Sequence, residues 1–310
     1  DCMTGDILTM VSMPAYDPNS FSDGIGRTEW TTLSEDPRRP LVNKVLNALY
    51  PPGSTIKPMN SLALLQHGVD PTERIHCPGG YRLGNRFFRC LGRHGSVDMR
   101  RAIAKSCNTY FYAMGHRVGY DKIALMARQL GLGEKFDLPV VSQSYGTVPD
   151  SAWKKRRFHE TKGFLERPDW TASDTLNASI GQGFLILNPL QLAIMAGRIA
   201  GGRDIAPRLL GIGKNPAPLL GIDPKHLEMV RGGMWEVVNG DGTAGASRLQ
   251  VPGVELCGTT GTAQVRKIVG SQRGQSGDWK YRDHGLFVFF APFDKPRYAG
   301  AVVIEHGMGG

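Results

Sequence analysis

Residues 52–58 read Pro-Gly-Ser-Thr-Ile-Lys-Pro and place a hydroxyl and an amine three residues apart. The apolar spacing that follows predicts a helix from Ser54 to Gln66, with Gly68 after its end. On that helix Ser54 and Lys57 share one face. A desolvated lysine loses its charge more easily and can take the serine proton, while the N–H groups of the helix start can stabilise an oxyanion. The same spacing also occurs by chance on solvated helices.

A second polar group, Ser106-Cys107-Asn108, follows further along the chain. We expect it at a tight break between two helices, 98–105 and 108–118. A hydroxyl and an amide two residues apart on a bend can both face one cleft. The alternative is an N-cap pair for the second helix.

A third group lies on a predicted strand, Gly258-Thr259-Thr260-Gly261-Thr262-Ala263-Gln264. The period of two sends Thr260 and Thr262 to the same face, where two hydroxyls can hold a carboxylate. Gly261 between them would let the backbone of a ligand lie close to the strand. A threonine-rich edge strand without a ligand is the alternative.

Four possible metal ligands follow the pattern Cys77-x12-Cys90-x3-His94-x12-Cys107. Three thiolates and one imidazole are a suitable tetrahedral set for Zn²⁺, although the gaps are longer than those of a zinc finger. A Cys77–Cys90 disulfide and unrelated buried thiols are the alternatives. The two other cysteines are expected to be ordinary core residues.

The order of the predicted helices and strands is typical of the α+β class, because the helices come first and the strands cluster at the end. Residues 20–50 are expected to be a mobile surface segment, 70–96 a structured loop and 140–178 a long polar excursion. We further expect a strand at 7–13, helices at 120–130, 189–200 and 224–239, and strands at 254–256, 261–265, 286–290 and 298–304.

Composition excludes several classes of protein. The chain has 310 residues, 41 % of them hydrophobic, and no apolar run long enough for a membrane span. A membrane-embedded body, a coiled coil and a low-complexity protein are therefore excluded. The net charge of +9 favours anionic neighbours, but no nucleic-acid recognition motif accompanies it. Neither end resembles a natural terminus, so we expect a fragment from which targeting and anchoring segments are absent.

The order and spacing of the three polar groups resemble the motifs of the penicillin-recognising serine acyltransferases. The sequence is similar to the transpeptidase domain of class B penicillin-binding proteins of the cell-elongation type. Further segments that carry this resemblance are 4–19, 179–192, 283–287 and 302–307. It implies a penicillin-binding/serine β-lactamase-like fold, with an antiparallel sheet flanked by helices and an all-helical subdomain. One transpeptidase domain would span 1–310, with a helical insertion over about 54–240 between sheet-forming ends.

The resemblance also implies a reaction. Ser54 would attack the penultimate D-Ala carbonyl of a peptidoglycan stem peptide, with Lys57 as general base. Ser106 would relay the proton to the leaving amine, and Asn108 would bind the substrate amide. An amine of a neighbouring stem would then take the acyl group, and a β-lactam would acylate the same serine.

The third motif would bind the substrate. Its glycine is Gly261, the hydroxyls of Thr260 and Thr262 would grip the substrate carboxylate, and the N–H groups of Ser54 and Thr262 would form the oxyanion hole. The family places a lysine where this chain has Thr259. Losing that charge would cost on the order of 10²–10³ in rate, unless Lys105 or an arginine replaces it.

Cofactor, partners and location follow from the same resemblance. Some elongation-type proteins bind zinc through a cysteine inside the second motif, which favours a structural zinc at Cys77, Cys90, His94 and Cys107; catalysis needs no cofactor. A periplasmic location favours the disulfide alternative. Expected partners are stem peptides, β-lactams, a RodA-type glycan polymerase and the elongation scaffold, with the domain held at the bacterial inner membrane. Alternative functions are a non-catalytic cell-wall scaffold or β-lactam sensor, which Thr259 suggests, and a serine β-lactamase.

Overall fold

The computed structural model describes residues 1–213, 215–265 and 278–310. Its α-helices are α1 (Arg27–Glu35), α2 (Lys44–Asn47), α3 (Lys57–Gln66), α4 (Met99–Ala104), α5 (Asn108–Val118), α6 (Tyr120–Gln129), α7 (Ser151–Glu160), α8 (Ala172–Ala178), α9 (Pro189–Gly201) and α10 (Pro224–Asn239). The 3₁₀ helices are η1 (Pro18–Phe21), η2 (Gly53–Ile56), η3 (Gly245–Ser247) and η4 (Trp279–Tyr281). The strands are β1 (Ile75–Cys77), β2 (Gly80–Leu83), β3 (Arg86–Arg89), β4 (Gly95–Val97), β5 (Cys257–Ala263), β6 (His284–Ala291) and β7 (Tyr298–Ile304).

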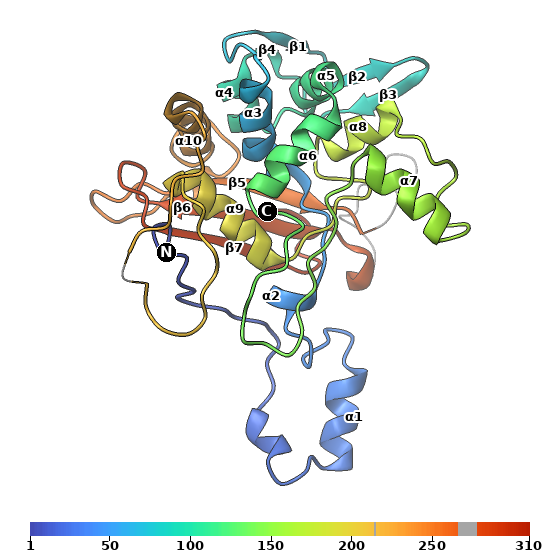
Figure 1. The fold of residues 1–310 in the computed structure, drawn as a ribbon, viewed down its shortest axis with the longest axis vertical. Helices are drawn as coiled ribbons and strands as arrows, with labels where there is room; N and C mark the ends of the chain where they lie inside the picture. Colours follow the sequence, from blue (N-terminus) through green and yellow to red (C-terminus); the bar gives the residue numbers. More distant parts are fainter. Residues whose placement is uncertain (214, 266–277) are drawn as a thin grey trace.

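The largest sheet comes from the end of the chain. Strands β5, β6 and β7 pair antiparallel in that order, with Thr260 opposite Phe287 and Leu286 opposite Val303. Helix α9 packs against β6 and β7, and α10 packs against β5 and α4 (Figure 1). One hydrophobic core joins the helices to this sheet. The α+β class and the antiparallel sheet flanked by helices are therefore confirmed.

The two long helices beside the sheet begin with strong local signals. Asn188 and Gln191 form a capping box at the start of α9, and Pro189 occupies its first turn. The Asp223 carboxylate accepts the backbone N–H of Lys225 at the start of α10. These side chains satisfy N–H groups that a helix start leaves without partners, which is why both helices follow the sequence prediction.

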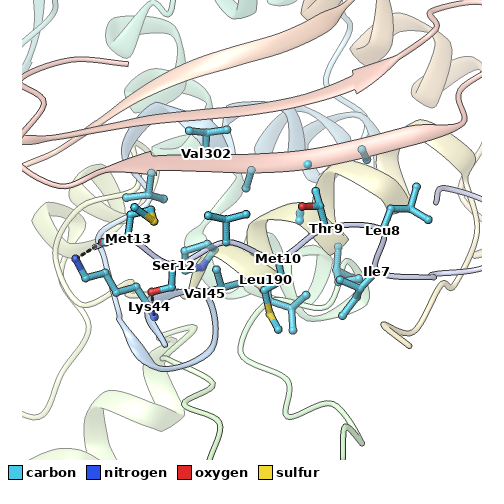
Figure 2. A pocket seen from close by; sticks show the side chains of 18 of the residues that line it. Ile7, Leu8, Thr9, Met10, Ser12, Met13, Lys44, Val45, Leu190 and Val302 are labelled. Carbon is cyan, nitrogen blue, oxygen red and sulfur yellow. Dashed lines mark hydrogen bonds between the residues drawn. The ribbon is translucent and has the colours of Figure 1, made fainter. Parts of the chain in front are cut away.

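The strand predicted at 7–13 is wrong. Asp6, just before this segment, forms an isolated bridge with Arg208. Residues 7–13 form no strand and pair with no neighbouring strand. A groove of about 890 Å³ separates this segment from β7, with Leu190 and Val45 among the residues that line it (Figure 2). The apolar run between Ile7 and Met13 favours extended backbone, but a strand also needs a neighbour at hydrogen-bonding distance. The expected sheet-forming contribution from the N-terminal end is thus missing in the described residues.

Several expected loops contain regular structure. The predicted loop at 70–96 holds two antiparallel pairs, β1 with β4 and β2 with β3. The excursion at 140–178 contains α7 and α8, and the surface segment at 20–50 contains α1 and α2. Residues 254–256 form no strand, and β5 begins at Cys257. In the part of the chain that the structure describes, no helix is both long and apolar enough to cross a membrane.

Candidate active site

Ser54 stands on η2, one turn before Lys57 begins α3. The preceding Gly53 has φ +56°, a conformation that favours glycine. A Cβ there would lie 2.5 Å from the carbonyl oxygen of Thr262, and the Gly53 N–H donates to the Gly181 carbonyl at 2.9 Å. Glycine at position 53 therefore lets β5 and the turn at Gly181 approach the serine closely.

Lys57 is buried with only 1 % of its surface exposed, and its ammonium lies among three oxygens. Its Nζ is 2.7 Å from the Ser106 carbonyl oxygen, 2.9 Å from Ser106 Oγ and 2.7 Å from Asn108 Oδ1. The first and second predicted motifs thus meet in one place. Ser54 Oγ has no hydrogen bond among the described residues. Its oxygen is therefore available to react with a ligand.

Burial lowers the pKa of Lys57 from its ordinary value of 10.5 to about 7, and the charges of Cys90 and Cys107 oppose this shift. A substantial fraction of the amine is then neutral near neutral pH. A neutral amine keeps two N–H donors and gains a lone pair. It can donate to the Ser106 carbonyl and to Asn108, and accept the Ser106 hydroxyl proton. This arrangement connects a base to a proton relay.

The backbone turn at Ser106 produces this geometry. Ser106 adopts φ +52°, between the end of α4 and the start of α5. A non-glycine residue in this region of backbone space is uncommon and occurs often at functional sites. Because of the turn, both the carbonyl and the hydroxyl of Ser106 face Lys57. The predicted break between the two helices is confirmed, and the capping alternative does not account for the contacts with Lys57.

The third motif lies on β5, an edge strand of the described sheet. Thr260 and Thr262 are half-buried and share one face, while Thr259 and Gly261 face the interior. Thr260 Oγ1 is 3.0 Å from Thr243 Oγ1, a hydroxyl that sequence reasoning did not select. Two partly exposed hydroxyls on one side of a free strand edge can hold an anionic peptide end.

Gly261 also has a role inside the protein. A Cβ there would lie 2.7 Å from Thr55 Cγ2 and 2.8 Å from the Pro52 carbonyl oxygen. The glycine therefore lets β5 pack directly against η2, which carries Ser54. Gln182 adds a hydrogen bond to the Thr262 carbonyl at 3.1 Å. The segment around Gly181 and Gln182 was noted in the sequence only through the resemblance; its paired glycines were the available signal.

No described cation replaces the lysine missing at position 259. Thr259 is 1 % exposed, and its hydroxyl donates to the Thr260 carbonyl at 3.4 Å. Lys105, the substitute considered from the sequence, instead forms an ion pair with Asp241 at 2.6 Å. Over residues 1–213, 215–265 and 278–310, no hydrogen bond or ion pair joins Lys105 to Ser106. Among these residues, Lys57 is accordingly the basic side chain in contact with the Ser106 hydroxyl.

Cys77, Cys90, His94 and Cys107 come together beside the second motif. Their four ligand atoms all lie within 4.8 Å of one another, and all five cysteines of the chain are free thiols. His94 Nδ1 is 3.6 Å from Cys77 Sγ and 3.5 Å from Cys90 Sγ. Zinc bonds of about 2.3 Å to sulfur and about 2.0 Å to nitrogen, at tetrahedral angles, put such atoms roughly 3.5 Å apart. The donor set fits zinc, whereas the alternative Cys77–Cys90 disulfide is not formed.

This cysteine and histidine cluster also contacts the second motif. The Asn108 N–H donates to Cys90 Sγ at 3.2 Å, and Cys107 separates Ser106 from Asn108 in the chain. The hydrogen bond with the Cys107 thiol lowers the pKa of Cys90. A thiol that gives up its proton readily is suited to metal binding.

Comparison with known proteins points to one family. The profile of the penicillin binding protein transpeptidase domain matches residues 1–310. Peptidoglycan D,D-transpeptidase MrdA of Acinetobacter baumannii is 35 % identical over 100 % of this chain and 47 % of its own length. The Escherichia coli K12 protein of the same name is 30 % identical over 100 % of this chain and 51 % of its own length. The chain thus spans about half the length of these curated relatives.

Solved structures agree with this result. Penicillin-binding protein PBP2 of Helicobacter pylori, in complex with MreC, superimposes with a TM-score of 0.88 and 33 % identity, covering 99 % of this chain and 55 % of that one. Pseudomonas aeruginosa PBP2 in complex with WCK 5153 gives a TM-score of 0.82 and 36 % identity, covering 98 % and 65 %. Both likenesses extend over the sheet, the helices and the site described above.

Proposed function

The chain belongs to the penicillin-binding protein transpeptidase family, of the PBP2 or MrdA type, and from this premise we propose that it cross-links peptidoglycan stem peptides as a D,D-transpeptidase. The observation that carries the proposal is the contact of buried Lys57 with Ser106 and Asn108. A buried amine held by a hydroxyl and an amide, one helical turn from a free serine, is suited to acyl transfer.

The first half-reaction forms an acyl-enzyme. Ser54 Oγ attacks the carbonyl of the penultimate D-Ala, a C–O bond forms, and the hydroxyl proton passes to Lys57. Ser106 then delivers its hydroxyl proton to the leaving nitrogen and recovers a proton from Lys57, the C–N bond breaks, and the terminal D-Ala departs. Backbone N–H groups of Ser54 and Thr262 would hold the oxyanion, because preorganised donors stabilise charge that develops in the transition state.

The second half-reaction reverses these steps with another amine. The amine of a neighbouring stem attacks the acyl carbon and a new C–N bond forms. Its proton returns through Ser106 and Lys57 to Ser54, and the serine leaves. The hydroxyls of Thr260 and Thr262 would hold the substrate carboxylate, and Asn108 would hold the substrate amide. The free edge of β5 supports this binding mode, since an extended peptide can pair with it.

A peptide assay tests the proposal. Incubation with a D-Ala-D-Ala-terminated peptide and an amine acceptor should release D-Ala and yield a cross-linked product. Both products should be absent from Ser54→Ala, and a β-lactam should block their formation. Ser34→Ala, at an exposed helix position away from the site, is the matched control. Equal product from the wild type and Ser54→Ala would refute the assignment.

A second function is favoured by one observation, the buried Thr259 in place of a lysine. Without that charge the protein would react with β-lactams but turn over peptides slowly, as a sensor or a cell-wall scaffold. Labelling by a penicillin combined with no peptide product would favour this alternative.

The cysteine and histidine cluster supports a structural zinc site held by Cys77, Cys90, His94 and Cys107. A bound ion would fix the turn that carries Ser106 and Asn108 by holding the residue between them. It would supply no step of the reaction, because the site uses its own amine and hydroxyls.

Partners and location are also proposals. The PBP2 of H. pylori is described in complex with MreC, and another solved relative belongs to a peptidoglycan synthase complex that coordinates polymerisation and crosslinking. For this chain we therefore propose an MreC-like elongation scaffold and a RodA-type polymerase as partners, at the periplasmic side of the bacterial inner membrane. Co-purification of the full-length protein with each partner tests this proposal.

A further inference from the structure

The hairpin of β2 and β3 carries an unusual charge. Residues 75–97 contain four arginines and neither aspartate nor glutamate. Arg82, Arg86, Arg89 and Arg93 are all exposed, and none forms an ion pair within the part of the chain that the structure describes. Some exposed arginines elsewhere are paired with a carboxylate, such as Arg117 with Glu73 at 2.7 Å. The hairpin therefore presents cations that no internal carboxylate neutralises.

The register of β2 and β3 places Arg82 and Arg89 on one face of the hairpin and Arg86 on the other. Arg82 lies opposite Phe87, and Arg89 lies opposite Gly80. These two pairs share one face of the hairpin. The Phe87 ring covers Gly80 and remains 48 % exposed. This outer face, made of Arg82, Phe87 and Arg89, combines two guanidinium groups with an open aromatic ring.

The opposite face is occupied by the protein itself. Phe88 packs with Tyr112 of α5 and Leu176 of α8. The Arg86 guanidinium stacks over the Phe88 ring at 4.7 Å. Arg86 thus has an aromatic partner within the hairpin and belongs to the inner face.

The end of β3 that carries Arg89 adjoins the candidate active site. The Arg89 carbonyl accepts the Asn108 side-chain N–H at 3.5 Å and the Tyr112 hydroxyl at 3.3 Å. The backbone that carries Arg89 is therefore in contact with the second motif. A bound peptide whose reacting end lies beside Asn108 would have its neighbouring groups within reach of an arginine side chain.

We propose that the outer face of the hairpin, through Arg82 and Arg89, binds carboxylates of the stem peptide beyond its reacting end. Guanidinium groups bind carboxylates through two parallel hydrogen bonds, and the ring between them offers an apolar surface to the peptide chain. The inference rests on the proposed function for its substrate. The carboxylate can belong to the donor stem or to the acceptor stem, and the experiment separates these two sources.

Equilibrium binding tests the inference without any turnover. Ser54→Ala protein is titrated with a fluorescent D-Ala-D-Ala-terminated peptide that carries one free side carboxylate, and with the same peptide after amidation of that carboxylate. Arg82→Gln or Arg89→Gln should weaken binding of the acidic peptide about threefold to tenfold. Binding of the amidated peptide should not change. Salt should weaken the wild-type contact and have less effect in the variants.

Arg86→Gln is the matched control, because it removes the same charge from the inner face of the same hairpin. It should leave both peptides bound as in the parent protein. Equal binding of acidic and amidated peptides by the parent would overturn the inference. A loss in Arg86→Gln as large as that in Arg82→Gln would also overturn it, since the effect would then be one of overall charge.

Two kinetic arms assign the carboxylate. In the donor arm, the rate of D-Ala release is compared for acidic and amidated donor peptides. In the acceptor arm, Ser54 is first acylated by a donor without side carboxylates, and the acceptor carries the acid or the amide. If Arg82→Gln slows only the acidic peptide in the donor arm, the carboxylate belongs to the donor stem. The same result in the acceptor arm assigns it to the acceptor stem. Absence of D-Ala release by the wild type would refute the proposed function, while the binding experiment would still decide the inference.

Discussion

At the scale of single residues, the central feature is one amine with three oxygen partners. Lys57 contacts the carbonyl and hydroxyl of Ser106 and the side chain of Asn108, and protein surrounds it almost completely. Because water is excluded, the charged form of the amine is disfavoured. Burial therefore makes the neutral, proton-accepting form of the Lys57 amine accessible near neutral pH.

This feature predicts the pH dependence of acylation. The pKa of Lys57 is about 7, lowered by burial. Below that pH the ammonium cannot accept the Ser54 proton, and above it the free amine can, so the second-order rate of penicillin acylation should rise about tenfold for each unit of pH below 7 and level off above it. A stopped-flow series from pH 5.5 to 9 measures this profile. A flat profile, or a midpoint near 10, would contradict the role of Lys57.

Position 259 gives the second prediction. Thr259→Lys should place an ammonium near the Ser106 hydroxyl and speed penicillin acylation, by up to 10²–10³. Thr259→Val has nearly the same shape as threonine and no charge, so it should leave the rate close to that of the wild type. The rates are compared by fluorescence-gel labelling over time. No gain in Thr259→Lys, in a protein that melts like the wild type, would show that the missing charge does not limit the reaction.

At the scale of elements, two short connections position the reacting groups. The 3₁₀ turn η2 carries Ser54 into contact with β5, and the left-handed turn at Ser106 aims the second motif at α3. The cysteine and histidine cluster adjoins that second turn through Cys107. Its effect on the reaction would be exerted through the position of Ser106 and Asn108.

Metal content tests this connection. Protein purified without chelator should contain one zinc ion per chain. Its removal should lower the melting temperature by several degrees and slow acylation, because the loop no longer fixes the turn at Ser106. Cys77→Ser should lose the zinc, whereas Cys2→Ser, at another buried thiol, should retain it. Atomic absorption that finds no zinc in the wild-type protein would exclude the site.

The sequence predicted those elements that carry strong local signals. The predicted strand from Tyr298 to Ile304 has its observed bounds. The helix from Pro224 to Asn239 begins at a proline, directly after the Asp223 cap. The paired strands within 75–97 were missed, because strands of three or four residues are too short to show a period of two. The segment at 7–13 has the apolar composition of a strand but lacks a neighbouring strand. Pairing depends on residues far away in the chain, which local patterns do not reveal.

The candidate site likewise contains residues that the sequence predicts and residues that only the fold reveals. Ser54, Lys57, Ser106 and Asn108 were selected by residue type and order, and the structure brings the last three into contact. Thr243 was missed, since a lone threonine far from any motif gives no signal. Its position near Thr260 arises from the packing of α10 against β5. The motifs therefore predicted which residues lie together, and only the fold revealed their neighbours.

At the scale of the whole molecule, a cluster around Glu305 joins distant parts of the chain. Its carboxylate accepts from Lys44 Nζ at 2.6 Å and from the Tyr50 hydroxyl at 2.9 Å. Lys44 begins α2, Tyr50 precedes the turn that carries Ser54, and Glu305 follows β7. The cluster therefore ties the end of the sheet to the segment leading into the candidate active site.

Glu305→Gln should lower the free energy of unfolding by about 1–3 kcal/mol, because it leaves a partly buried ammonium without its counter-charge. Burial raises the pKa of Glu305, but the hydrogen bonds from Lys44 and Tyr50 outweigh it, so the folded pKa lies below the ordinary 4.5. The contribution is thus present above pH 4.5 and is lost as the pH falls through the lower folded value. Urea unfolding at pH 7 and at pH 4 measures it. Glu160→Gln, in an exposed pair with Arg156, should change stability far less; equal losses in the two variants would contradict a stabilising role of the Glu305 cluster.

Covalent labelling shows whether Ser54 is the nucleophile. The wild-type protein is incubated with a penicillin, and its intact mass and its proteolytic fragments are measured by mass spectrometry. The account predicts a single adduct equal to the mass of the whole β-lactam, located on Ser54 and formed more slowly when Lys57 is replaced by alanine. An unmodified protein after prolonged incubation, or an adduct on any other residue, would contradict it.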